Sequence, residues 1–142
     1  MISAVVDPSV LVSAFIGRPD AGPGRVVSAW REGRFTLISS PLMLEELADV
    51  LGRPKFERWA GDGRGAAFIA GLATLSDHYS DPEDAPSGVR DPEDEYLVAL
   101  ARLAGADALV SLDLDLLEAP LGDLTICRPF EFLTRLDAES SR

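Results

Sequence analysis

The sequence predicts a single α/β domain with helices on both faces of a central, mostly parallel sheet of four to five strands. Short apolar segments alternate with segments of helical periodicity along the whole chain, which is the pattern of a parallel sheet. The length of 142 residues is that of one domain, and the apolar fraction of 46% supports a packed core. We therefore expect a three-layer α/β/α domain over residues 1–136, followed by a frayed tail at 137–142.

The N-terminal part contains two predicted strands, at residues 2–6 and 35–39, because both segments are short and apolar. A short helix is expected at 9–15. After a loop rich in glycine and proline, a second helix is expected at 24–31, and Gly33 can end it.

The middle of the chain is predicted to be mainly helical. Ser40 is a suitable N-cap and Pro41 suits the first helical position, so a helix is expected at 41–51. Gly52 follows as a stop signal. The other elements expected here are helical segments at 55–59 and 66–75, a short strand at 78–79 and a loop at 81–88.

The C-terminal part begins with a strongly predicted helix. Asp91 is its expected N-cap and Pro92 its first residue, and the apolar periodicity continues to about residue 103. The remaining elements are strands at 108–111 and 124–127 and a closing helix at 129–136.

Charge and composition exclude several classes of protein. The formal net charge of −11 argues against a protein that binds nucleic acid by general electrostatics, but it is compatible with recruiting a divalent metal or a basic partner segment. One cysteine, Cys127, and one histidine, His78, are too few for a disulfide or a conventional zinc site. No apolar run approaches the roughly 20 residues of a membrane helix, and the N-terminus lacks the features of a signal peptide. We expect a cytoplasmic protein with no membrane association.

Acidic residues follow two strands that are expected to be central. Asp7 comes directly after residues 2–6, and Asp113 and Asp115 follow the strand at 108–111. In open α/β sheets, sites form beyond the carboxyl ends of the strands, so these carboxylates should lie close together. Each aspartate alone could instead cap the turn that follows it. Together they would repel one another unless a cation is bound.

Two helices offer further carboxylates. Asp94 lies three residues after Asp91, so it either completes the cap of its helix or turns toward the cluster. On the helix at 41–51, Glu46 falls at the rim of the apolar arc and Glu45 points nearly opposite, so Glu46 is the better candidate ligand. Oxygen ligands of this kind predict a hard cation, Mg²⁺ or Mn²⁺. The tetrapeptide Asp-Pro-Glu-Asp also occurs at Asp81, but it opens no predicted helix there and is left outside the site.

Five segments, taken in order and spacing, carry a resemblance to a known family: residues 6–14, 40–47, 90–97, 109–117 and 126–133. The chain resembles the PIN-domain family, and most closely its VapC-like toxin ribonucleases of bacterial toxin–antitoxin systems. The resemblance implies a PIN-like fold, Mg²⁺- or Mn²⁺-dependent hydrolysis of RNA, a small inhibitory antitoxin and a homodimer. One departure is Pro8, where such toxins more often have threonine.

The resemblance also implies roles for individual residues. The implied catalytic residues are Asp7, Glu46, Asp94 and Asp113; the implied metal ligands are Asp7, Asp94, Asp113 and Asp115; and the implied supporting residues are Ser9, Ser111 and Asp91.

Two alternatives remain open from the residues. The first is a catalytically weak or inactive PIN-like module that binds an antitoxin or nucleic acid. The second is a phosphoryl-transfer or receiver domain, which also places aspartates at strand ends but needs a lysine nearby. Lys55 is poorly placed for that purpose. Trp59 and Tyr96 could stack on bases, although packing in the core or an interface is favoured for both.

Overall fold

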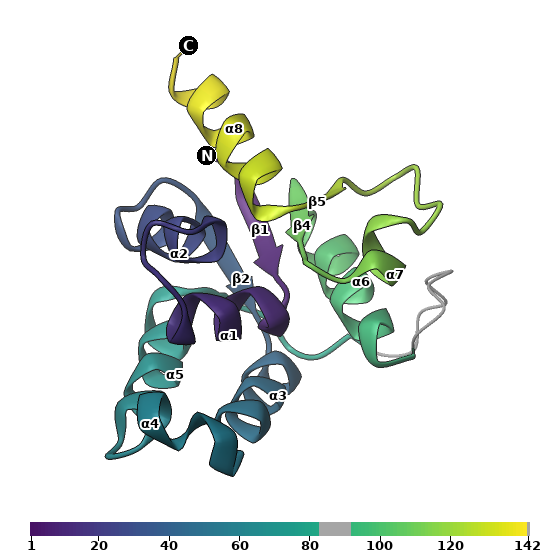
Figure 1. Ribbon diagram of the computed structural model, residues 1–142. Coiled ribbons are helices and arrows are strands. Elements are labelled where there is room, and N and C mark those ends of the chain that lie inside the picture. Colours follow the sequence, from purple (N-terminus) through teal and green to yellow (C-terminus); the bar gives the residue numbers. More distant parts are fainter. Residues whose placement is uncertain (83–91, 142) are drawn as a thin grey trace.

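The protein is built around a five-stranded, all-parallel sheet with helices on both faces (Figure 1), as the sequence predicts. The computed structural model describes residues 1–82 and 92–141, with the backbone alone described at 92–94. The strand order is β3-β2-β1-β4-β5. The strands are β1 (Ser3–Val6), β2 (Thr36–Ser39), β3 (Asp77–His78), β4 (Ala108–Val110) and β5 (Ile126–Cys127).

The N-terminal strand β1 lies at the centre of this sheet. Val5 of β1 is opposite Ile38 of β2 on one side and Leu109 of β4 on the other. Because all the pairings are parallel, the carboxyl ends of β1, β2 and β4 meet at one edge, where we expect the site.

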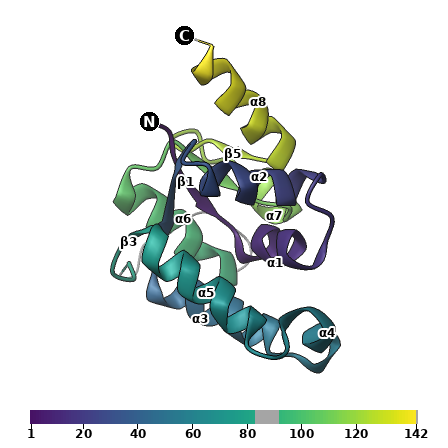
Figure 2. The ribbon, with the colours of Figure 1, turned by 90° about the vertical axis from the view of Figure 1, so that its left-hand side faces the viewer.

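The helices divide into two layers and an arm. The helices α1, α2 and α8 pack together on one side of the sheet and α6 lies on the other (Figure 2). The helices α3 to α5 extend beyond the carboxyl edge, and residues 41–75 are called the arm below. The helices are α1 (Pro8–Ile16), α2 (Gly22–Arg31), α3 (Pro41–Leu51), the 3₁₀ helix η1 (Pro54–Phe56), α4 (Glu57–Ala60), α5 (Arg64–Leu75), α6 (Pro92–Ala104), α7 (Leu114–Leu117) and α8 (Pro129–Ser140). Among the described residues, no helix combines the length and apolarity needed to cross a membrane.

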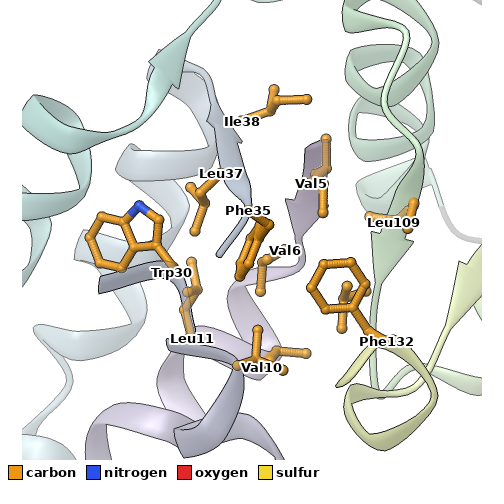
Figure 3. Packing of buried hydrophobic residues seen from close by; sticks show 14 of the residues in the cluster. Val5, Val6, Val10, Leu11, Trp30, Phe35, Leu37, Ile38, Leu109 and Phe132 are labelled. Atoms are coloured by element: carbon orange, nitrogen blue, oxygen red, sulfur yellow. The ribbon is translucent and has the colours of Figure 1, made fainter. Parts of the chain in front are cut away.

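The core lies between β1, β2, β4 and the helices that cover them (Figure 3). Phe35 and Phe132 meet edge to face with ring centroids 4.9 Å apart, which joins β2 to α8. Trp30 of α2 is buried, and its indole N–H donates to the carbonyl of Leu75 at the end of α5. These contacts hold α8 against β2 and join α2 to the end of α5, at the base of the arm.

Local sequence signals explain how the helices begin. Asp7 caps α1 with Pro8 at the first helical position, and Ser40 caps α3 through the backbone N–H of Met43. Gly33 ends α2 with a φ of +75°, a conformation that glycine adopts without strain.

Two departures of the observed elements from the expected ones bear on the site and the end of the chain. The short helix α7, which follows Asp113, is absent from the sequence-based elements, because four residues leave no periodicity to detect. The closing helix α8 continues to Ser140, beyond the expected end at residue 136. Asp137 of this extension forms an ion pair with Arg34 at 2.7 Å, so the additional turn of α8 contacts the segment just before β2.

Candidate functional site

Asp7 is a buried carboxylate at the carboxyl end of the central strand. Its side chain is only 6% exposed, and its backbone N–H continues the sheet by donating to Val110 at 2.9 Å. One carboxylate oxygen, Oδ1, accepts the backbone N–H of Ser9 at 3.0 Å. The other, Oδ2, accepts the hydroxyl of Ser111 at 2.6 Å. Asp7 thus caps α1 with one oxygen and faces β4 with the other, so the capping and the site interpretations are compatible.

Ser111 joins Asp7 to the turn that carries Asp113. This serine is fully buried, and its hydroxyl accepts the backbone N–H of Asp113 at 3.0 Å while donating to Asp7. Asp113 in turn caps α7, since its Oδ1 accepts the N–H of Asp115 at 2.9 Å. The structure therefore brings Asp7, Ser111 and Asp113 together, with Asp115 in the adjoining first turn of α7.

The electrostatics of Asp7 favour a cation nearby. Burial raises the pKa of Asp7, and the neighbouring carboxylate of Asp113 raises this pKa further. The hydrogen bonds from Ser111 and Ser9 act in the opposite direction and lower it, but burial is the largest influence. When ionised, Asp7 is a buried charge whose free energy falls when a positive charge lies beside it.

Glu46 lies on α3, beside an open groove of about 450 Å³ that runs along this helix. The carboxylate of Glu46 is half-buried and accepts a hydrogen bond from the hydroxyl of Tyr96 on α6. Glu45 lines the same groove but is exposed, whereas Glu46 is half-buried at the rim of the apolar face of α3. The groove is lined by Leu42, Glu45, Glu46, Asp49, Val50, Arg53 and Tyr96.

The structure does not describe the side chains of two expected site residues, Asp91 and Asp94. Asp91 lies outside the described residues, and Asp94 lies in the first turn of α6 with its backbone alone described. Among the described residues, no group of three or more acidic, histidine or cysteine side chains is arranged to hold a metal. The donors that do converge, Asp7 and Asp113, are carboxylates and fit the oxygen preference of Mg²⁺ and Mn²⁺. A complete set of ligands would need a contribution from α6.

Sequence reasoning missed two contacts that shape this region. The hydroxyl of Tyr96 reaches Glu46, although packing was favoured for Tyr96. Asp81, from the first Asp-Pro-Glu-Asp, accepts the backbone N–H of Leu42 at 2.9 Å and so caps the start of α3. Neither contact has a signal in the local sequence, because each joins segments about 40 to 50 residues apart.

His78 and Cys127 do not join the site. The Nδ1 atom of His78 is 2.9 Å from the hydroxyl of Ser39, and this fully buried hydroxyl is also 2.6 Å from that of Ser76. The three side chains fasten the edge strand β3 to β2 and the end of α5. Burial raises the pKa of the Cys127 thiol to about 11, so this thiol is a poor nucleophile at neutral pH.

Comparison with known proteins gives one family match and several structural relatives. A family model described as PIN domain matches residues 3–115. No curated protein gives a significant match. A chain in the crystal structure of VapBC2 from Rickettsia felis, bound to a DNA fragment from their promoter, superposes with a TM-score of 0.60 at 12% identity, covering 89% of this chain and 98% of that one. PAE2754 from Pyrobaculum aerophilum superposes with a TM-score of 0.52 at 18% identity, covering 97% and 90%.

Proposed function

Because the chain belongs to the PIN-domain family, we propose that it is a metal-dependent endoribonuclease acting on single-stranded RNA. The observation that carries the proposal is the buried Asp7, joined by the Ser111 hydroxyl to the Asp113 turn at the carboxyl edge of the sheet. Two central strands end in these carboxylates, and α3, which carries Glu46 and borders the open groove, begins directly after the end of the neighbouring strand β2. This is the arrangement in which α/β folds place their chemistry.

In this proposal Asp7 and Asp113 are ligands of Mg²⁺ or Mn²⁺, with Asp94 of α6 as a third ligand and Asp115 as an accessory. When bound, the ion supplies a Lewis acid for the scissile phosphate and lowers the pKa of water, so that hydroxide is available at neutral pH. Ser111 and the Ser9 N–H fix the orientation of the Asp7 carboxylate through the two hydrogen bonds described above. The hydroxyl of Tyr96 holds Glu46 at the wall of the groove, where RNA would lie.

We also propose a partner for the protein. The fold is shared with a chain of the VapBC2 structure, which supports a toxin that forms a pair with a small antitoxin. A homodimer is part of the same proposal and rests on the family resemblance alone. Glu45, Glu46 and Asp49 line the groove along α3 and offer an acidic surface to a basic antitoxin segment. The same groove would then serve for substrate and inhibitor, so that binding of the antitoxin excludes RNA.

The test is cleavage of a labelled single-stranded RNA by the purified protein with Mg²⁺, with Mn²⁺ and with EDTA. We expect cleavage with at least one ion, none with EDTA, and none from Asp7→Asn. The matched control is Asp107→Asn, because Asp107 adjoins β1 and β4 at their opposite ends and accepts the backbone N–H of Ser3 at 2.8 Å. Cleavage that survives EDTA or Asp7→Asn would contradict the proposal. Absence of cleavage with both ions would favour the alternative of an inactive binding module.

A further inference from the structure

The cations of this acidic chain are unevenly paired with carboxylates. Arg18, Arg34, Arg102 and Arg128 each form an ion pair with an aspartate or glutamate. The exposed side chains of Arg53, Lys55 and Arg58 in the arm form no ion pair with any carboxylate in the described parts of the chain, and neither do Arg25 and Arg31 of α2. Residues 53–64 contain four basic and two acidic residues, a local charge of +2 in a chain of −11.

Two of these cations lie over aromatic rings. The ammonium of Lys55 is 5.1 Å from the centre of the Phe56 ring, and the guanidinium of Arg58 is 4.7 Å from that of Trp59. The two rings are 6.4 Å apart and both are half-buried. We call η1 and α4, with Arg53, the arm tip. Alternation of cations and aromatic rings on an exposed surface is how proteins hold single-stranded nucleic acid without reading its sequence.

The arm tip is continuous with the groove along α3. Arg53 lines one end of this groove, and Leu42 lines the other end, near Glu46 and Tyr96. The lining residues on α3 itself run from Leu42 to Val50, eight positions or about 12 Å at the helical rise of 1.5 Å per residue, and Arg53 follows the end of the helix. The arm tip projects away from the sheet at the far end of the arm (Figure 2). A chain anchored there can follow α3 back toward Asp7.

We propose that the arm tip binds the flank of a single-stranded RNA substrate, and this inference rests on the proposed function. Lys55 and Arg58 contact backbone phosphates, Trp59 and Phe56 stack on bases, and Arg53 directs the strand into the groove. The groove itself is acidic, with Glu45 and Asp49 on its wall, so it repels a polyanion where no metal is bound. The arm tip supplies the positive charge that the groove lacks.

A second copy of this chain is also acidic and could meet the same cations. The aromatic rings favour RNA over a second copy of this chain. Bases stack on the faces of aromatic rings, whereas an acidic protein surface would pair with the cations alone. The test must nevertheless separate the two partners.

The chain offers a matched control for the charges of the arm tip. Arg25 and Arg31 of α2 are exposed and also lie over aromatic rings. The guanidinium of Arg25 is 5.8 Å from the ring centre of Phe130, and that of Arg31 is 5.8 Å from the ring centre of Phe68. A Lys55→Gln/Arg58→Gln double variant and an Arg25→Gln/Arg31→Gln double variant therefore remove the same charge from the same kind of contact at two different places.

Binding is measured by fluorescence anisotropy of a labelled single-stranded RNA over a series of NaCl concentrations. Both double variants are made in an Asp7→Asn background, which prevents cleavage. Since each phosphate contact on a single strand contributes about 0.7 to the slope of log K against log salt, the arm-tip variant is expected to lose about 1.4 from that slope and about tenfold or more in affinity. The α2 variant is expected to stay within about twofold of the parent, because its charges lie away from the strand.

Trp59 gives a second readout that needs no change in the arm tip. The chain has two tryptophans, and Trp30 is 7% exposed in the core, so quenching by RNA reports on Trp59. We expect RNA to quench tryptophan fluorescence of the Asp7→Asn protein and to do so less in the arm-tip variant. Circular dichroism of both variants checks that they are folded.

Equal loss of RNA affinity in the two double variants would overturn the inference, and so would the absence of tryptophan quenching when RNA binds. In either case, cleavage of RNA by the wild type would leave the proposed function standing. Unchanged RNA binding together with a shift from dimer to monomer in sedimentation would also overturn the inference and would make the arm tip an interface between copies. If the wild type cleaves no RNA and the Asp7→Asn protein binds none, the inference fails together with the proposed function.

Discussion

Replacement of Ser111 by alanine tests the link between the two strand ends directly. The hydroxyl of Ser111 donates to the carboxylate of Asp7 at 2.6 Å and accepts the N–H of Asp113 at 3.0 Å, in a place with no exposed surface. A hydrogen bond to a charged group is worth about 1.5–3 kcal/mol and a neutral one about 1 kcal/mol. We therefore expect Ser111→Ala to lower the free energy of unfolding by about 3 kcal/mol at neutral pH, or about 10 °C in Tm for a chain of this size.

The assay is urea unfolding of the metal-free protein at neutral and at acidic pH, with Ser40→Ala as the control. Ser40 is equally buried, but its hydroxyl accepts only a helix N–H at 3.4 Å, so its loss is expected to cost about 1 kcal/mol. Protonation of Asp7 removes the charge from the Ser111 hydrogen bond, so the cost of Ser111→Ala should fall at acidic pH while that of Ser40→Ala stays constant. In a double-mutant cycle with Asp7→Asn we expect a coupling of about 1–2 kcal/mol. A loss as small as that of Ser40→Ala, or no coupling, would refute the reasoning.

Three further predictions follow from contacts at the same edge. Since burial raises the pKa of Asp7, the contribution of this carboxyl to stability is present below its ordinary pKa and is lost as the pH rises through the raised pKa. Asp7→Asn should therefore raise the Tm of the metal-free protein at neutral pH. Calorimetry should show that this increase in Tm grows with pH. Asp81→Ala removes the cap on the Leu42 N–H and should lower the free energy of unfolding in urea by about 1 kcal/mol, whereas no change would exclude the cap. Tyr96→Phe releases Glu46 from its hydroxyl partner and should slow RNA cleavage about tenfold with little change in Tm; an unchanged rate would make this hydrogen bond incidental.

The sequence was sufficient for the fold class because its strongest patterns are local. The apolar segments at β1, β2 and β4 and the capped starts of α1 and α3 each carry their signal within a few residues. The parallel arrangement follows from the alternation of these strands with helices. The limits of short elements such as η1 and α7 were not predictable, since one turn of helix has no periodicity.

The candidate site was predictable in its strand-end members and less so on the helices. Asp7 and Asp113 could be placed because a parallel sheet puts the carboxyl ends of its strands at one edge, and the structure places them there with Ser111 between them. The neighbourhood of Glu46 depends on Tyr96, which is 50 residues away in the chain. The paired cations and rings of the arm tip depend on side-chain directions that composition does not give.

The central position of the first strand has a consequence for biosynthesis. Asp7 leaves the ribosome well before its partners, because the strand β4 that neighbours β1 and the hydroxyl partner Ser111 lie 104 residues later in the chain. During translation the nascent chain cannot close the middle of the sheet until the residues between β1 and β4 have also been made. Fragments that end before Ser111 therefore lack the hydrogen bond that joins Asp7 to the second strand end.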